Sequence, residues 1–91
     1  MRLTFEWNEG KARANLKKHG VSFEEASTVF ADTLSVTIPD PLHSDEENRL
    51  VTIGATSGHK ILVIVHCDRR DRIRIISARP ATTKERKTYE G

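Results

Sequence analysis

The chain has 91 residues, of which 36% are hydrophobic and 31% are charged, with a formal net charge of +2. This length predicts one domain over residues 1–91, large enough to bury a core without disulfides or a metal. The lone Cys67 excludes an internal disulfide and a cysteine-based zinc site. The apolar run 60–65 is too short to span a bilayer and the N-terminus lacks a signal peptide, so we expect a cytoplasmic protein without membrane contact.

The charges are distributed unevenly. Residues 1–48 contain five Lys or Arg and nine Asp or Glu, whereas residues 49–91 contain ten and four. Eight of the fifteen cations lie in one stretch: Arg69, Arg70, Arg72, Arg74, Arg79, Lys84, Arg86 and Lys87. Arg presents a planar fork of donors that stays charged and suits phosphate, so RNA or DNA is the first partner to consider. A solvated basic face is the alternative.

The first third of the chain predicts one strand and two helices. Apolar and polar residues alternate over 2–6, which indicates a short strand. Asn8 can cap a helix that ends at His19, followed by a glycine suited to the left-handed conformation. Ser22 then begins a capping box and a second helix that stops near Asp32.

The rest of the chain predicts four strands and a short helix. Alternating or continuous apolar residues mark strands over 33–38, 49–55, 60–66 and 72–78, and a second capping box begins a helix over 82–89. Residues 60–66 are apolar on both faces, so this strand should lie centrally in the sheet.

The resulting order, β-α-α-β-β-β-β-α, predicts an α+β fold. We expect an antiparallel sheet with the two N-terminal helices packed on one face and a short C-terminal helix. In the last strand Ile73 and Ile75 should face the helices, while Arg72 and Arg74 point to the other face, which is left for a ligand.

If such a surface performs chemistry, cleavage of an RNA backbone is the most compatible reaction. The 2′-hydroxyl is a built-in nucleophile, arginines can stabilise the extra charge on phosphorus, and His, Glu, Lys or Tyr can transfer the protons. The alternative is a non-catalytic nucleic-acid-binding or regulatory module, in which the arginines only hold phosphates.

Three further groups of residues have competing interpretations. The first group is the polar segment from His43 to Arg49. Within it, His43, Asp45 and Glu46 could bind a metal ion, as in a metal-dependent nuclease. Their Pro-flanked loop has no repeated ligand spacing, so a solvated loop is the simpler interpretation. In the same segment Glu47 and Arg49 lie two residues apart and share a face, so a carboxylate kept ionised by arginines could accept a proton.

The other two groups lie on helices. His19 is either a helix C-terminal cap or a ring presented at the sheet edge. Glu85 and Tyr89 share one helix face, with Arg86 in the adjacent row. They either cap the helix and pack in the core, or Tyr89 stacks on a base or donates a proton.

Taken together, these residues resemble the BrnT family of toxins. The resemblance rests on Trp7-Asn8, on the segment His19–Ala26 with Val29-Phe30 after it, and on Arg72–Arg79 followed by Ala81, Glu85 and Tyr89. It covers essentially the whole chain and implies a RelE-like fold. The loop 39–48, with two prolines and His43, departs from the shared pattern, so catalysis is not assigned to His43.

The resemblance implies a ribonuclease toxin of a type II toxin–antitoxin pair that cleaves RNA without a metal or other cofactor. The RNA would be free or on the ribosome. The implied partner is a BrnA-type antitoxin with a ribbon-helix-helix part, through which the pair would bind its operator DNA.

Residue roles follow from the same resemblance. Arg79 is the first candidate for transition-state stabilisation and Arg74 the second. Glu47, with Arg49, is a candidate base, Tyr89 a candidate acid or stacking platform, and His19 a weaker candidate. Independently of the resemblance, the cation-rich stretch itself leads us to expect RNA binding by Arg70, Arg72, Lys84 and Arg86.

Overall fold

The computed structural model describes residues 3–40 and 48–91. Within this part the elements are, in order, β1 (Thr4–Glu6), α1 (Glu9–His19), α2 (Phe23–Ser27), the 3₁₀ helix η1 (Thr28–Ala31), β2 (Val36–Pro39), β3 (Arg49–Ala55), β4 (Ile61–Arg69), β5 (Arg72–Pro80) and α3 (Thr83–Glu90). The α+β class and the predicted order of elements are therefore confirmed.

The five strands form one sheet in the order β1-β5-β4-β3-β2, so the predicted central position of the strand over 60–66 is confirmed. Strands β2 to β5 pair antiparallel, but β1 pairs parallel with β5. The expected antiparallel pairing of consecutive strands is confirmed, whereas the expectation of an antiparallel sheet was wrong for β1, which makes the sheet mixed. Short hairpins dictate antiparallel pairing only between consecutive strands, whereas β1 reaches β5 after two helices and three other strands.

Two element boundaries differ from the expectation. The second helix changes to 3₁₀ geometry after Ser27. The next strand starts at Val36 instead of residue 33, because Asp32 organises a turn before it. The Asp32 carboxylate accepts from the Leu34 N–H at 3.0 Å and its carbonyl accepts from the Ser35 N–H at 3.2 Å.

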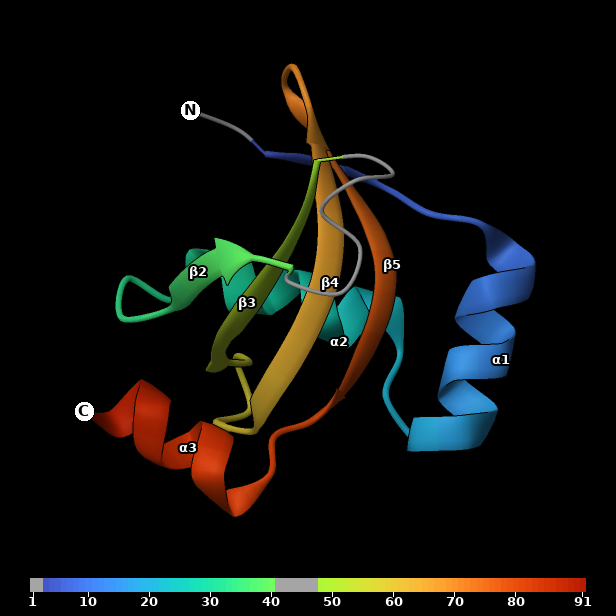
Figure 1. The fold of residues 1–91 in the computed structure, drawn as a ribbon. Coiled ribbons are helices and arrows are strands. Elements are labelled where there is room, and N and C mark those ends of the chain that lie inside the picture. Colours follow the sequence, from blue (N-terminus) through green and yellow to red (C-terminus); the bar gives the residue numbers. More distant parts are fainter. Residues whose placement is uncertain (1–2, 41–47) are drawn as a thin grey trace.

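The core lies between the sheet and the helices. In Figure 1, α2 crosses behind the sheet and α1 flanks the β5 side. The fully packed residues of this layer are Val21, Phe23, Ala26, Val29, Leu62, Ile64, Ile75 and Ala78. Ile73 and Ile75 face this layer, while Arg72 and Arg74 occupy the opposite face, as predicted. We call that opposite face the open face.

A β-bulge in β5 changes which residues reach the open face. Ser77 pairs with Val65 and Ile75 pairs with His66, so Ile76 is an extra residue between them. Strict alternation would place Arg79 on the core side with Ile75, because they are an even number of positions apart. The bulge resets the alternation, so that Ala78 enters the core and Arg79 lies on the open face with Arg74.

The side chain of Asn15 completes β5 beyond the end of β1. Its amide nitrogen donates to the carbonyls of Ala78 at 2.8 Å and Val21 at 3.0 Å, and its oxygen accepts from the Ala78 N–H at 3.1 Å. Because β1 pairs only with residues 72–74, the amide of Asn15 takes the place of a strand neighbour at Ala78. Asn15 is 7% exposed, so these bonds are protected from water.

We expect Ile75→Ala to lower the free energy of unfolding by about 2–5 kcal/mol, because it removes a buried side chain and leaves a cavity. Ile75 is 1% exposed, whereas Ile38, on the open face, is 47% exposed and gives a matched control. Urea unfolding followed by circular dichroism measures both variants. If Ile75→Ala and Ile38→Ala lowered the free energy of unfolding by the same amount, the assignment of Ile75 to the core face of β5 would be wrong.

We expect the nearly isosteric Asn15→Asp to destabilise the fold by about 1–3 kcal/mol for each carbonyl that it leaves without a donor. The new carboxylate would also lie against the carbonyl oxygens of Val21 and Ala78. Ala14→Asp, at an exposed position of the same helix, introduces the same group and is the control. Similar urea midpoints for the two variants would show that the hydrogen bonds from Asn15 to the backbone of Val21 and Ala78 do not stabilise the fold.

Candidate functional site

The open face carries a row of side chains from four strands near the end of the sheet where the turn joins β4 to β5. Register places Glu6 of β1 beside Arg74 of β5, Arg74 beside Cys67 of β4, and Cys67 beside Arg49 of β3. Directly paired residues of neighbouring strands share a face, so two of the predicted catalytic residues, Arg74 and Arg49, lie in one row. Cys67 is 3% exposed beneath its neighbours.

The arginines next to this row are concentrated around one carboxylate. Arg69 pairs directly with Arg72, an arrangement in which like charges repel across the strands. Glu6 lies beside them, with its carboxylate oxygens 3.6 Å from Arg72 Nη1 and 3.2 Å from Arg74 Nη1. Among residues 3–40 and 48–91, the arginines around Glu6 outnumber the carboxylates that contact them, which favours the binding of a further anion.

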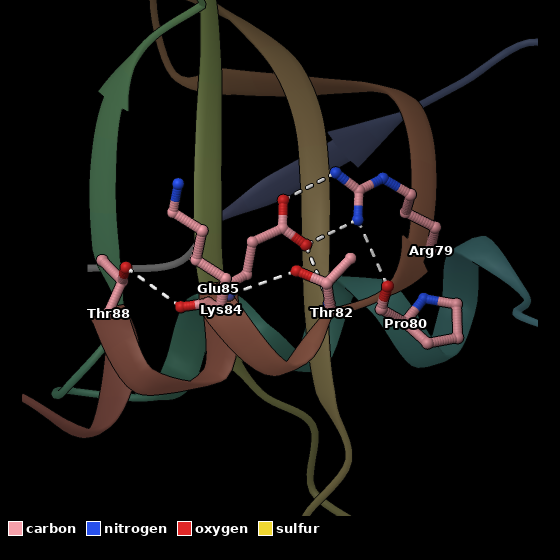
Figure 2. A network of polar contacts seen from close by, with 6 residues as sticks. All are labelled: Arg79, Pro80, Thr82, Lys84, Glu85 and Thr88. Carbon is pink, nitrogen blue, oxygen red and sulfur yellow. Dashed lines mark hydrogen bonds and ion pairs between the residues drawn. The ribbon is translucent and has the colours of Figure 1, made fainter.

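Arg79 lies at the end of β5 and pairs with the first turn of α3 (Figure 2). Its Nη1 and Nη2 donate to the two carboxylate oxygens of Glu85 at 2.7 and 2.8 Å, and Nη1 also contacts the Pro80 carbonyl at 3.3 Å. Glu85 is fixed in turn by the capping box of α3: its carboxylate accepts from the Thr82 N–H at 2.8 Å. The guanidinium is therefore held in one orientation by a network of hydrogen bonds.

This network shifts the pKa values of both partners. Hydrogen bonding to Arg79 lowers the pKa of Glu85 to about 2, so the carboxylate is charged at neutral pH. The same hydrogen bonds raise the pKa of Arg79. The Arg79 side chain is 41% exposed, and a guanidinium has five N–H donors, so the pair does not exhaust its capacity to bind phosphate.

Tyr89 lies one helical turn beyond Glu85 and contacts Asp32, the residue that follows η1. Its hydroxyl donates to Asp32 Oδ2 at 2.6 Å, and that carboxylate also accepts from the Ala55 N–H at 2.9 Å and the Leu34 N–H at 3.0 Å. These bonds, led by that from Ala55, lower the pKa of Asp32, while the bond to Asp32 raises the pKa of Tyr89. The hydroxyl thus connects α3 to the remainder of the fold.

His19 and Arg86 lie at the end of the sheet. Together with His59 and Lys60 they line a hollow of about 450 Å³ between the end of α1 and α3. The sequence predicted the first two as site residues but gave no reason to single out the other two, because His59 and Lys60 occupy an ordinary turn and strand start.

The remaining predicted site residues are separate from these groups or outside the described residues. Arg70 occupies the turn between β4 and β5 with a φ of 55°. Lys84 projects from the first turn of α3 near Glu85 in Figure 2. Glu47 lies outside the described residues, as do those of the alternative metal site, His43, Asp45 and Glu46. Among residues 3–40 and 48–91, no three His, Cys, Asp or Glu side chains gather in a way that could hold a metal ion.

A polar chain crosses the helix-covered side of the sheet. Thr37 Oγ1 lies 2.8 Å from Thr52 Oγ1, Thr52 Oγ1 lies 2.7 Å from His66 Nε2, and His66 Nδ1 lies 2.9 Å from Asp68 Oδ1. Burial lowers the pKa of His66, so the imidazole is neutral at neutral pH. Because Asp68 can only accept, Nδ1 carries the proton and Nε2 accepts from Thr52. This chain joins three strands and faces away from the arginines.

Sequence reasoning missed Glu6 and Asn15. Glu6 reaches Arg72 and Arg74 only through the parallel pairing of β1, which no local pattern signals. Asn15 lies in the middle of a helix with mostly exposed neighbours. An amide side chain in the middle of a helix would have been the only local indication that Asn15 makes buried hydrogen bonds.

Comparisons with known proteins agree with this architecture. The family described as "Ribonuclease toxin, BrnT, of type II toxin-antitoxin system" matches residues 7–85. The 1.1 Å crystal structure of the Brucella abortus ribonuclease toxin BrnT superimposes with a TM-score of 0.70 and 22% identity, covering 90% of this chain and 100% of that one. At this identity the likeness establishes a shared fold. A search of curated protein sequences found no significant match.

The described helices were compared with the requirements for spanning a membrane. Over residues 3–40 and 48–91, none of them combines the length and the apolar character needed for a bilayer crossing.

Glu85 should contribute stability that depends on pH. Its folded-state pKa of about 2 lies below the ordinary 4.5, so its contribution is complete above pH 4.5 and is lost as the pH falls toward 2. We therefore expect the difference in unfolding free energy between the parent and Glu85→Gln to be constant near neutrality and to shrink over this window. Urea unfolding at a series of pH values measures it. A difference that stays constant down to pH 2 would contradict the depressed pKa.

Proposed function

The chain belongs to the BrnT family of ribonuclease toxins of type II toxin–antitoxin systems, and we propose that it is a metal-independent RNA endonuclease. The observation that carries the proposal is the placement of Arg69, Arg72 and Arg74 on the open face. Two of these arginines stand directly opposite each other, which costs stability unless an anion lies between them. RNA phosphate is the anion that the family's activity provides.

The proposed reaction uses the 2′-hydroxyl of RNA as nucleophile. A base removes its proton, the 2′-oxygen bonds to the neighbouring phosphorus, and the bond from phosphorus to the 5′-oxygen breaks as that oxygen gains a proton. The products are a 2′,3′-cyclic phosphate and a 5′-hydroxyl. Negative charge increases on the phosphoryl oxygens in the transition state, where a pre-oriented guanidinium stabilises it most.

Arg79 is the proposed transition-state stabiliser and Arg74 the second. Support for Arg79 comes from the bidentate pair with Glu85, which fixes the guanidinium before RNA arrives. Glu85 is then a positioning residue for Arg79. Fixing a charged group in advance removes the cost of orienting it during the reaction.

The proton transfers are proposed for the groups that the family resemblance indicates. Glu47, two residues before Arg49 in the sequence, is the first candidate base. Tyr89 and His19 are the others, although the Tyr89 hydroxyl donates to Asp32 and would have to exchange that bond to act on RNA. The cations Arg70, Arg72, Lys84 and Arg86 are proposed to hold neighbouring phosphates.

A type II toxin has an antitoxin partner, and we propose that here it is of the BrnA type. Its ribbon-helix-helix part would bind operator DNA, so that this chain reaches DNA only through the antitoxin. The proposed site of action is the cytoplasm, on RNA that is free or on the ribosome.

The hydrogen bond from the Tyr89 hydroxyl to Asp32 favours one alternative function, a non-catalytic nucleic-acid-binding module, because a hydroxyl in this bond is not free to transfer a proton to RNA. In that case the arginines would supply affinity while no side chain exchanges protons with the 2′-hydroxyl. The two functions differ in whether bound RNA is cleaved.

We expect Arg79→Ala to abolish growth arrest on induced expression in bacteria and to lower RNA cleavage by about 10²–10³-fold in the presence of EDTA, as for loss of one charge-stabilising donor. Growth and total-RNA integrity are followed together, and the purified protein is assayed on RNA. Arg13→Ala, an exposed arginine of α1, is the control. Equal arrest by parent and Arg79→Ala would exclude Arg79 from the site, and RNA bound but intact with the parent would support the binding module.

A further inference from the structure

The hollow at the end of the sheet combines basic and apolar groups in one small space. It measures about 450 Å³, which lies within the usual range of small-ligand sites. Basic nitrogens come from His19, His59, Lys60 and Arg86, while part of the apolar wall comes from Ile61, Leu62 and Pro80. A nucleotide matches this combination, because its phosphate suits the cations and its base suits an apolar surface.

The backbone around His19, His59 and Lys60 has a defined local structure that positions these side chains beside the hollow. His19 is the last residue of α1, and Gly20 turns the chain after it with a φ of 71°. His59 has a φ of 68°, which L-residues rarely adopt, in a turn closed by its N–H bond to the Thr56 carbonyl at 2.9 Å. Thr56 Oγ1 also accepts from the Lys60 N–H at 3.1 Å, so the turn presents both residues in a fixed way.

The ion pair that Lys60 makes at the hollow is a weak one. Lys60 Nζ lies 3.4 Å from Glu25 Oε2, but the Lys60 side chain is 66% exposed. Exposed ion pairs of this kind contribute little stability, so a phosphate can replace Glu25 as the partner of Lys60. Glu25 would then compete with the ligand.

The hollow adjoins Arg79 along the chain. Pro80 and Ala81, which line it, directly follow Arg79, and Arg86 directly follows Glu85, the partner of Arg79. A strand of RNA bound at Arg79 would therefore enter the hollow by crossing the Pro80-Ala81 segment.

We propose that this hollow is a subsite for a nucleotide next to the scissile phosphate, with Lys60, His59 and Arg86 binding its phosphate. This inference rests on the proposed function, since it takes Arg79 as the site of cleavage. It adds His59 and Lys60 to the RNA-binding residues and gives Glu25 an opposing role.

Binding is tested with a fully 2′-O-methylated oligonucleotide, which cannot be cleaved, by fluorescence anisotropy over a series of salt concentrations. We expect Lys60→Gln to weaken binding about 3–10-fold and to reduce the slope of log affinity against log salt by about 0.7, the value for one phosphate contact on a single strand. His59→Asn, which tolerates a positive φ, should also weaken binding. Glu25→Gln should strengthen it, an effect that a merely structural residue would not give.

Lys17→Gln removes one exposed cation of α1 that does not line the hollow and is the matched control. The subsite is overturned if Lys60→Gln and Glu25→Gln bind the oligonucleotide like the parent and this control. Cleavage of a dinucleotide, whose single phosphate is the scissile one and which therefore has no second phosphate for Lys60 to bind, should be equal in the parent and Lys60→Gln. A parent that binds in the predicted way but cleaves no RNA would overturn the proposed function and leave the subsite supported.

Discussion

The hydrogen bonds between the Asn15 amide and the backbone of Ala78 are the constraint on which the rest of the structure depends. They join α1, the segment before α2 and β5 at one buried point. They also fix the backbone of the residue that precedes Arg79. The direction in which the chain leaves the sheet, and with it the start of α3, therefore depends on one amide in a helix that is otherwise mostly exposed. Buried backbone groups need partners, and here one side chain replaces a missing strand.

The open face carries charge in an arrangement that ordinary strand pairing opposes. Arginines of β4 and β5 face each other beside Glu6, which contacts Arg72 and Arg74, while Glu85 binds Arg79 at the other end of β5. Among residues 3–40 and 48–91, these two carboxylates leave an excess of cations on this face. Carboxylates of this kind reduce repulsion among the cations and fix their side chains. This cost in stability is consistent with the anion-binding role proposed for this face.

Local patterns in the sequence were sufficient for most of the fold. The caps of the helices, the central strand and the orientation of Ile73 and Ile75 followed from periodicity and turn chemistry. The parallel pairing of β1 did not, because it depends on contacts between distant segments. The bulge at Ile76 could not be predicted from the sequence either. Strict alternation from Arg74 would put Arg79 on the core face, whereas the bulge puts it on the open face. The choice of Arg79 as the first catalytic candidate came from the family resemblance alone. The resemblance itself was confirmed by the match over residues 7–85. The roles of individual site residues stay predictions.

The attachment of α3 has a consequence for dynamics. This helix has no buried residue, so its position depends on the polar contacts of Glu85 with Arg79 and of Tyr89 with Asp32. Elements held in this way open at a low free energy compared with the core. An anion that takes Arg79 from Glu85 removes one of these two contacts and so loosens the helix, and by reciprocity a helix held firmly in place weakens the binding of that anion. For an anion that displaces Glu85 in this way, occupancy of Arg79 and the order of the C-terminal helix are thermodynamically linked, whereas an anion that binds the remaining donors of Arg79 leaves the helix contact intact.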